Sequence, residues 1–254
     1  MRRLLPLVLL DQRALRTRYA ILGAFTLLIL ISGVAARVLG FHDGHFDPAR
    51  LFVYGGPALP SAVLVAGWLV GRLPMAAALL LCAGVLSAEV ESGRARLWAA
   101  PPGARLAPHA ARLAGRLAAA FLWAALFMPL FDLLVIGTWA GPATWVLALA
   151  QVLVYGSVTA LLSVFTRADA ALALLAGVAA MVWDAARRAD ALVGTPPGVR
   201  EALTFVLPPQ GALHNLELAF ADLAAIPWAA FAYTAIYAAL LLVLAGAAFA
   251  RREI

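Results

Sequence analysis

The chain has 254 residues, of which 65% are hydrophobic and 13% charged, against about 45–50% apolar and about 25% charged residues in a soluble domain. This composition excludes an ordinary water-soluble enzyme and is typical of a membrane protein. The net charge of +6 is explained by membrane topology and attraction to anionic headgroups, so no nucleic-acid partner is expected. We predict an all-α, polytopic membrane protein with a single transmembrane domain over 1–254.

The N-terminal segment 1–19 is predicted to form an interfacial helix on the cytoplasmic side of the membrane. Leu4, Val8 and Leu15 fall on one helical face, and Asp11 interrupts this apolar stripe. The first apolar run ends at Asp11 with no small-residue cleavage site after it, so we expect no removable signal peptide. The first span is therefore expected to anchor the protein.

Apolar stretches predict six transmembrane helices, with the arginine-rich ends on the cytoplasmic side. The expected spans are 20–39, a kinked span at 51–88, 117–140, 142–165, 169–186 and 226–250. This arrangement places both termini and the segment 89–116 in the cytoplasm. A break at Gly71–Pro74 would either kink the second span or separate a re-entrant approach from the crossing proper.

The segment 191–223, between the fifth and sixth spans, is expected on the extracellular side. It contains two proline pairs, Pro196–Pro197 and Pro208–Pro209, and is also rich in leucine, phenylalanine and alanine. This composition favours short interfacial or re-entrant helices over a disordered loop.

The segment 89–116 carries the most informative motif. It begins with two carboxylates, breaks at a glycine, continues through apolar residues and reaches two prolines, a pattern that predicts a short amphipathic helix at the cytoplasmic surface. It resembles the six-span permease subunits of bacterial ABC exporters, the second class of ABC membrane components. The matching residues are Glu89, Glu91, Gly93, Pro102 and Arg105, with Arg112 or Arg116 as the basic residue that opens the third span. Arg94 stands where the family commonly has threonine.

The resemblance implies that this segment is a coupling helix, which docks on a separate cytoplasmic ABC ATPase and transmits its motion to the spans. The expected coupling residues are Glu89, Glu91, Gly93, Leu97, Trp98, Pro102 and Arg105. The alternative is a charged cytoplasmic loop that serves only as a topology signal. By resemblance the N-terminal helix would also touch the ATPase, while Arg13, Arg16 and Arg18 would contact either the ATPase or headgroups.

Three ionisable residues fall inside the predicted spans: Arg72, Asp132 and Asp184. At about 1.5 Å per helical residue, all three lie roughly 22–26 Å from the cytoplasmic edge. A charge at such a depth is costly unless it is paired or hydrated, so Arg72 is a candidate partner for Asp132 or Asp184. The alternative is that each side chain reaches the outer interface separately.

The expected function is that of a permease subunit, which moves a hydrophobic or amphipathic substrate across the bacterial cytoplasmic membrane. By resemblance it pairs with a second permease copy or a related permease, and ATP and Mg²⁺ bind only the partner ATPase. The chain lacks lysine and therefore a Walker A loop, so it cannot itself be the ATPase. We expect no enzymatic activity and no metal or cofactor bound by this chain. The alternatives are an ion-coupled carrier and, with less support, an intramembrane hydrolase.

Overall fold

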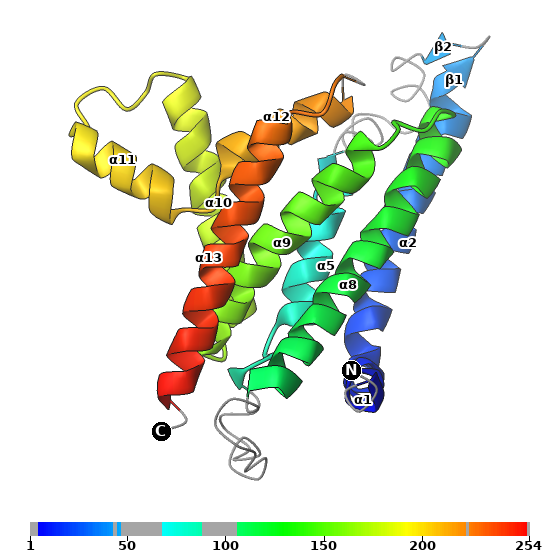
Figure 1. Ribbon diagram of the computed structural model, residues 1–254. Helices are drawn as coiled ribbons and strands as arrows, with labels where there is room; N and C mark the ends of the chain where they lie inside the picture. Colours follow the sequence, from blue (N-terminus) through cyan, green and yellow to red (C-terminus); the bar gives the residue numbers. More distant parts are fainter. Residues whose placement is uncertain (1–4, 43–44, 47–67, 88–105, 222–223, 253–254) are drawn as a thin grey trace.

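The described part of the protein is almost entirely helical. The computed structural model describes residues 5–42, 45–46, 68–87, 106–221 and 224–252 (Figure 1). Its helices are α1 (Leu5–Ala14), α2 (Arg16–Gly40), α5 (Leu73–Cys82), α8 (Leu106–Phe131), α9 (Ala143–Ser163), α10 (Asp169–Arg188), α11 (Pro197–Val206), α12 (Gln210–Ala221) and α13 (Trp228–Arg252), with a π-helical turn, η1, at Asp132–Ile136. One short antiparallel pair joins β1 (Phe41–His42) to β2 (His45–Phe46).

Within these ranges, five helices are long and apolar enough to cross a membrane: α2, α8, α9, α10 and α13. The prediction of an all-helical protein with several helices able to span a membrane is therefore confirmed. The predicted kinked span 51–88 is described only from residue 68 onward, and its helix α5 is a short apolar helix of 10 residues.

The chain breaks where the sequence predicts an interruption. Residues 68–70 are helical, 71–72 form a turn, and α5 starts immediately afterwards with Pro74 in its first turn. Proline fits this position because the first helical N–H groups have no partner within the helix. The helix ends before Ala83, which is extended, and Gly84 follows with a φ of +65°, a conformation that favours glycine.

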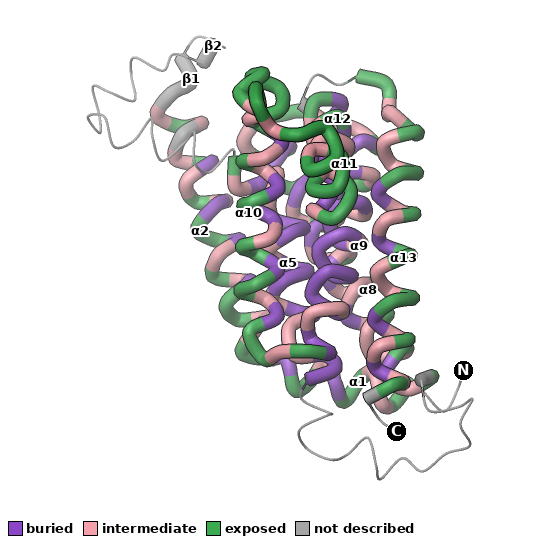
Figure 2. The backbone as a smooth tube through the Cα atoms, turned by 90° about the vertical axis from the view of Figure 1, so that its left-hand side faces the viewer, coloured by how far each residue is buried: buried purple, intermediate pink, exposed green. Residues whose placement is uncertain are grey.

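α9 is the central helix of the bundle. Of its spanning window 72% is buried within the protein, compared with 17–28% for the other four long helices. Figure 2 shows this continuous buried track through the middle of the molecule. Close packing is possible because Gly156 on α9 faces Leu117, whose side chain lies 2.2 Å from the position a Cβ would occupy. A larger residue at position 156 would therefore force the Leu117 side chain of α8 to move.

The outer helices expose large apolar side chains. Leu28 on α2, Leu126 on α8 and Val243 on α13 are all more than 60% exposed. A soluble monomer rarely presents so much apolar surface, whereas the hydrocarbon core of a bilayer is a suitable solvent for it. This distribution agrees with a membrane protein.

The elements are sorted between the two ends of the bundle. α1, the C-terminal ends of α5 and α13 and the start of α8 lie at one end, the α1 end (Figure 1). α11, α12 and the β1–β2 pair lie at the opposite end, the α11 end. Polar clusters are found toward both ends.

Candidate functional site

The proposed coupling residues lie outside the described part of the chain. Glu89, Glu91, Gly93, Leu97, Trp98, Pro102 and Arg105 all fall within 88–105. The coupling role therefore stays a prediction. The described helices that flank this segment, α5 before it and α8 after it, meet in a polar cluster at the α1 end.

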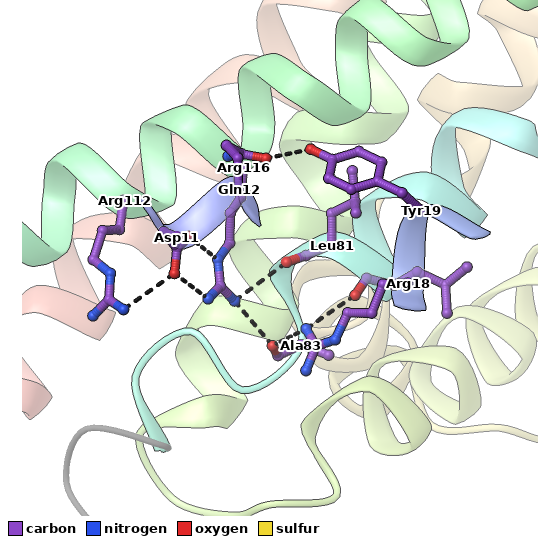
Figure 3. Close-up of polar contacts among 9 residues, drawn as sticks. Asp11, Gln12, Arg18, Tyr19, Leu81, Ala83, Arg112 and Arg116 are labelled. Atoms are coloured by element: carbon purple, nitrogen blue, oxygen red, sulfur yellow. Dashed lines mark hydrogen bonds and ion pairs between the residues drawn. The ribbon is translucent and has the colours of Figure 1, made fainter. Parts of the chain in front are cut away.

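Asp11 is the centre of that cluster, although it lies on a mainly apolar helix. Its Oδ2 and Oδ1 accept hydrogen bonds from Nε and Nη2 of Arg116 at 2.7 and 2.8 Å, and Nη2 of Arg112 lies 3.1 Å from Oδ1 (Figure 3). Asp11 is 4% exposed and Arg116 7%. A bidentate arginine–carboxylate pair is the geometry in which such burial is tolerated.

The same Arg116 also binds the end of α5. Its Nη1 donates to the carbonyl oxygens of Leu81 and Ala83 at 3.3 and 3.1 Å. From α2, Arg18 donates to the carbonyl of Leu80 at 3.1 Å and to that of Ala83. The last carbonyl groups of a helix have no partner within it and carry a partial negative charge, so two guanidinium groups are well matched to them.

A fourth helix reaches the same turn. Oδ2 of Asp169, the first residue of α10, accepts a hydrogen bond from the backbone N–H of Gly84 at 2.6 Å. We call Asp11, Arg18, Arg112 and Arg116, together with Asp169, the arginine clamp. The clamp joins α1, α2, α8 and α10 to the end of α5, directly before the segment 88–105.

The clamp makes stability depend on pH through Asp11. Burial raises the pKa of this carboxyl, but hydrogen bonds and charges from Arg116 and Arg112 outweigh burial, so the pKa lies below its ordinary value. A lowered pKa in the folded state means that the stabilisation is present above the unfolded-state pKa of ~4 and is lost as the pH falls through the lower, folded-state pKa.

We therefore expect Asp11→Asn to melt at a lower temperature than the parent protein at pH 7, with the difference shrinking as the pH falls below ~4. Melting curves in detergent across this range would measure the effect. A difference that stays constant with pH would show that the carboxylate charge of Asp11 does not stabilise the fold.

A second polar cluster lies at the other end of α5. Arg72 binds both carboxylate oxygens of Glu217 on α12, with Nη2 3.0 Å from Oε2. Nε2 of Gln151 on α9 donates to the carbonyl of Gly71 at 2.8 Å and to Oε1 of Glu217 at 3.2 Å. The guanidinium carbon of Arg72 also lies 5.6 Å from the centre of the Trp68 ring. Arg72 is thus paired with Glu217 rather than with either aspartate proposed from the sequence.

The two aspartates have local partners. Asp184 on α10 lies 3.3 Å from Arg187 and 3.0 Å from Arg188, one helical turn away. Asp132 is fully buried at the start of η1; Oδ2 accepts the N–H of Ala140 at 3.3 Å, and Oδ1 has no hydrogen-bond partner among the described residues. The structure does not bring the three predicted intramembrane charges together.

Sequence reasoning missed Glu217 and Gln151. Gln151 was a visible signal, because a glutamine in the middle of an apolar span needs a polar partner. Glu217 lies in the segment expected outside the membrane, where a charge needs no buried partner. The described residues hold no group of three or more possible metal ligands. Comparison with protein-family models, curated proteins and solved structures finds no match for this chain.

Proposed function

We propose that the chain is the transmembrane permease subunit of an ABC exporter. In this proposal it moves a hydrophobic or amphipathic substrate across the bacterial cytoplasmic membrane, with six spans and both termini in the cytoplasm. ATP and Mg²⁺ bind to a separate ATPase, and a second permease copy or a related permease completes the transporter. The chain itself is not an enzyme.

The arginine clamp is the observation that carries this proposal. The proposed coupling segment, 88–105, follows α5 within a few residues, and the end of α5 is bound by Arg18, Arg116 and Asp169 from three other helices. A push on this segment would therefore reach α2, α8 and α10 through charge-assisted hydrogen bonds, and α1 through the pair of Arg116 and Asp11. A coupling device needs such a connection, whereas a loop that serves only as a topology signal does not.

The sequence motif supplies the second support. Glu89, Glu91, Gly93, Pro102 and Arg105 have the residue types and spacing of the coupling segment in exporter permeases. The apolar outer surface of α2, α8 and α13 supports a membrane location. α1, which contributes Asp11 to the clamp, would be the interfacial helix that lies on the membrane beside the ATPase.

The test is a pull-down of the tagged protein from gently solubilised native membranes. We expect a nucleotide-binding ATPase in roughly stoichiometric amount, and we expect its loss when Glu91→Ala and Gly93→Pro are combined. Glu201→Ala, an acid-to-alanine change on α11 at the opposite end of the bundle, is the matched control and should retain the ATPase. Absence of any ATPase, under conditions that preserve other membrane complexes, would contradict the proposal.

One observation favours a second candidate, an ion-coupled carrier. Asp132 is a fully buried acidic residue whose Oδ1 has no hydrogen-bond partner within the described ranges, and isolated intramembrane acids are common in proton and ion pathways. Transport by the purified chain in liposomes, driven by a proton gradient without ATP and abolished by Asp132→Asn, would establish this alternative.

A further inference from the structure

A cavity of about 500 Å³ lies toward the α11 end, between α10, α11, α12 and α13. Its size is in the range of small-molecule sites. The polar and aromatic side chains around it include Trp183, Asp184, Arg187, Arg188, His214 and Asn215. The arginine clamp lies at the other end of the bundle and shares no residue with this cavity.

The charge in the cavity is unbalanced. Two guanidinium groups, Arg187 and Arg188, share the carboxylate of Asp184, one on each oxygen. The carboxylate is buried, with 6% of the side chain exposed, whereas the two arginine side chains are 45% and 48% exposed. One negative charge neutralises only one of the two arginines, so the lining attracts anions.

The first turn of α12 adds to this preference. Gln210, Gly211 and Ala212 line the cavity at the N-terminus of a 12-residue helix, where the helix dipole is positive. At Gly211 a Cβ would lie 2.9 Å from Nη2 of Arg187 and 3.1 Å from Oδ1 of Asp184. Glycine therefore allows Arg187 and Asp184 to approach the start of α12 closely. The arginine side chains and the N-terminus of α12 both line this cavity.

Apolar surface borders the cavity as well. No residue of α11 is buried, and Val199, Phe205 and Val206 on this helix are 47–69% exposed. Leu207 and Tyr233 line the cavity wall. A short amphipathic helix at the end of two membrane-spanning helices, α10 and α13, is suited to the headgroup region of a bilayer. A ligand there would meet positive charge at one side and apolar contacts at the other.

We propose that this cavity binds the phosphate group of an anionic amphiphile. Phosphate matches the planar, bidentate donors of arginine, and in the cavity it would replace Asp184 as the partner of one guanidinium. The apolar part of the ligand would lie against α11 and Tyr233. A membrane phospholipid and a free phosphate compound share this headgroup chemistry. The proposal concerns only residues of this chain and does not depend on an ATPase partner.

The experiment measures binding of a fluorescent phosphatidylglycerol to the protein in nanodiscs of zwitterionic phosphatidylcholine. We expect saturable binding that is at least about tenfold weaker in Arg187→Gln, Arg188→Gln, because charge-assisted hydrogen bonds are lost. The control, Arg251→Gln, removes a positive charge from an exposed position at the α1 end and should leave the affinity unchanged. An equal loss in both variants would indicate general electrostatic attraction and overturn the proposal.

Asp184→Asn provides a second test with the opposite sign. Removal of the competing carboxylate is expected to leave phosphate binding unchanged or to tighten it, whereas loss of binding in a variant of unchanged melting temperature would contradict the site. Displacement of the probe by inorganic phosphate at millimolar concentration would assign the site to free phosphate compounds, and resistance to displacement would assign it to a lipid. A parent protein that binds phosphatidylcholine and phosphatidylglycerol probes equally would also refute the proposal.

Discussion

Arg116→Met is expected to lower the free energy of unfolding by about 3–5 kcal/mol, the range found when one partner of a buried ion pair is removed. Asp11 would keep only Arg112, and the carbonyl groups of Leu81 and Ala83 would lose a donor. Methionine fills a similar space without restoring either interaction. Reversible unfolding by sodium dodecyl sulfate in mixed micelles, followed by circular dichroism, would measure the change.

Two controls separate the arginine clamp from a general effect of charge. Arg16→Met removes an exposed arginine from the start of α2, close in sequence to Asp11. This change should alter stability by less than about 0.5 kcal/mol. Asp11→Leu combined with Arg116→Met removes both charges and should cost less than the sum of the two single changes. If Arg116→Met were as stable as Arg16→Met, the clamp would have no structural role.

The second large effect is expected at the pair between Arg72 and Glu217, whose side chains are 14% and 20% exposed. Arg72→Leu or Glu217→Leu alone should each cost about 3 kcal/mol, because each leaves the opposite charge without its partner inside the bundle. The double variant should cost clearly less than the sum, with a coupling energy of at least about 1 kcal/mol. The same unfolding assay, applied to the parent protein, the two single variants and the double variant, completes this double-mutant cycle.

Asp132→Leu offers the matched comparison for that cycle. The sequence suggests Asp132 as a partner of Arg72, but in the structure its carboxylate accepts the N–H of Ala140 instead. Combined with Arg72→Leu, Asp132→Leu should therefore be additive within about 0.5 kcal/mol. Strong coupling between residues 72 and 132, with none between 72 and 217, would contradict the observed pairing.

The helical class and the five long apolar helices could be predicted from the sequence because both depend on local composition. Each residue of an uncharged stretch adds separately to the preference of that stretch for the hydrocarbon core. The break at Gly71–Arg72 was equally accessible, since a proline at position 74 restricts where a helix can start. These features need no knowledge of what packs against them.

The partners of the charged residues were much harder to predict. Asp11 looked like a flaw in an apolar stripe, and its partner Arg116 lies 105 residues away along the chain. Nothing in the local pattern selects this arginine among 19. Similarly, Arg72 and Glu217 are separated by 145 residues, and the choice of Glu217 depends on how α12 packs onto α9.

The central position of α9 has a consequence for motion. α5, α8, α10, α12 and α13 all contact α9 directly, so any two of these helices are separated by at most one intermediary. A displacement that starts in α5 can reach the cavity between α10, α11, α12 and α13 through α9, or directly through α10, without passing along the chain. α9 is therefore the helix through which these five helices are connected. Distances from a spin label on α9 to labels on the surrounding helices would show which of them move together.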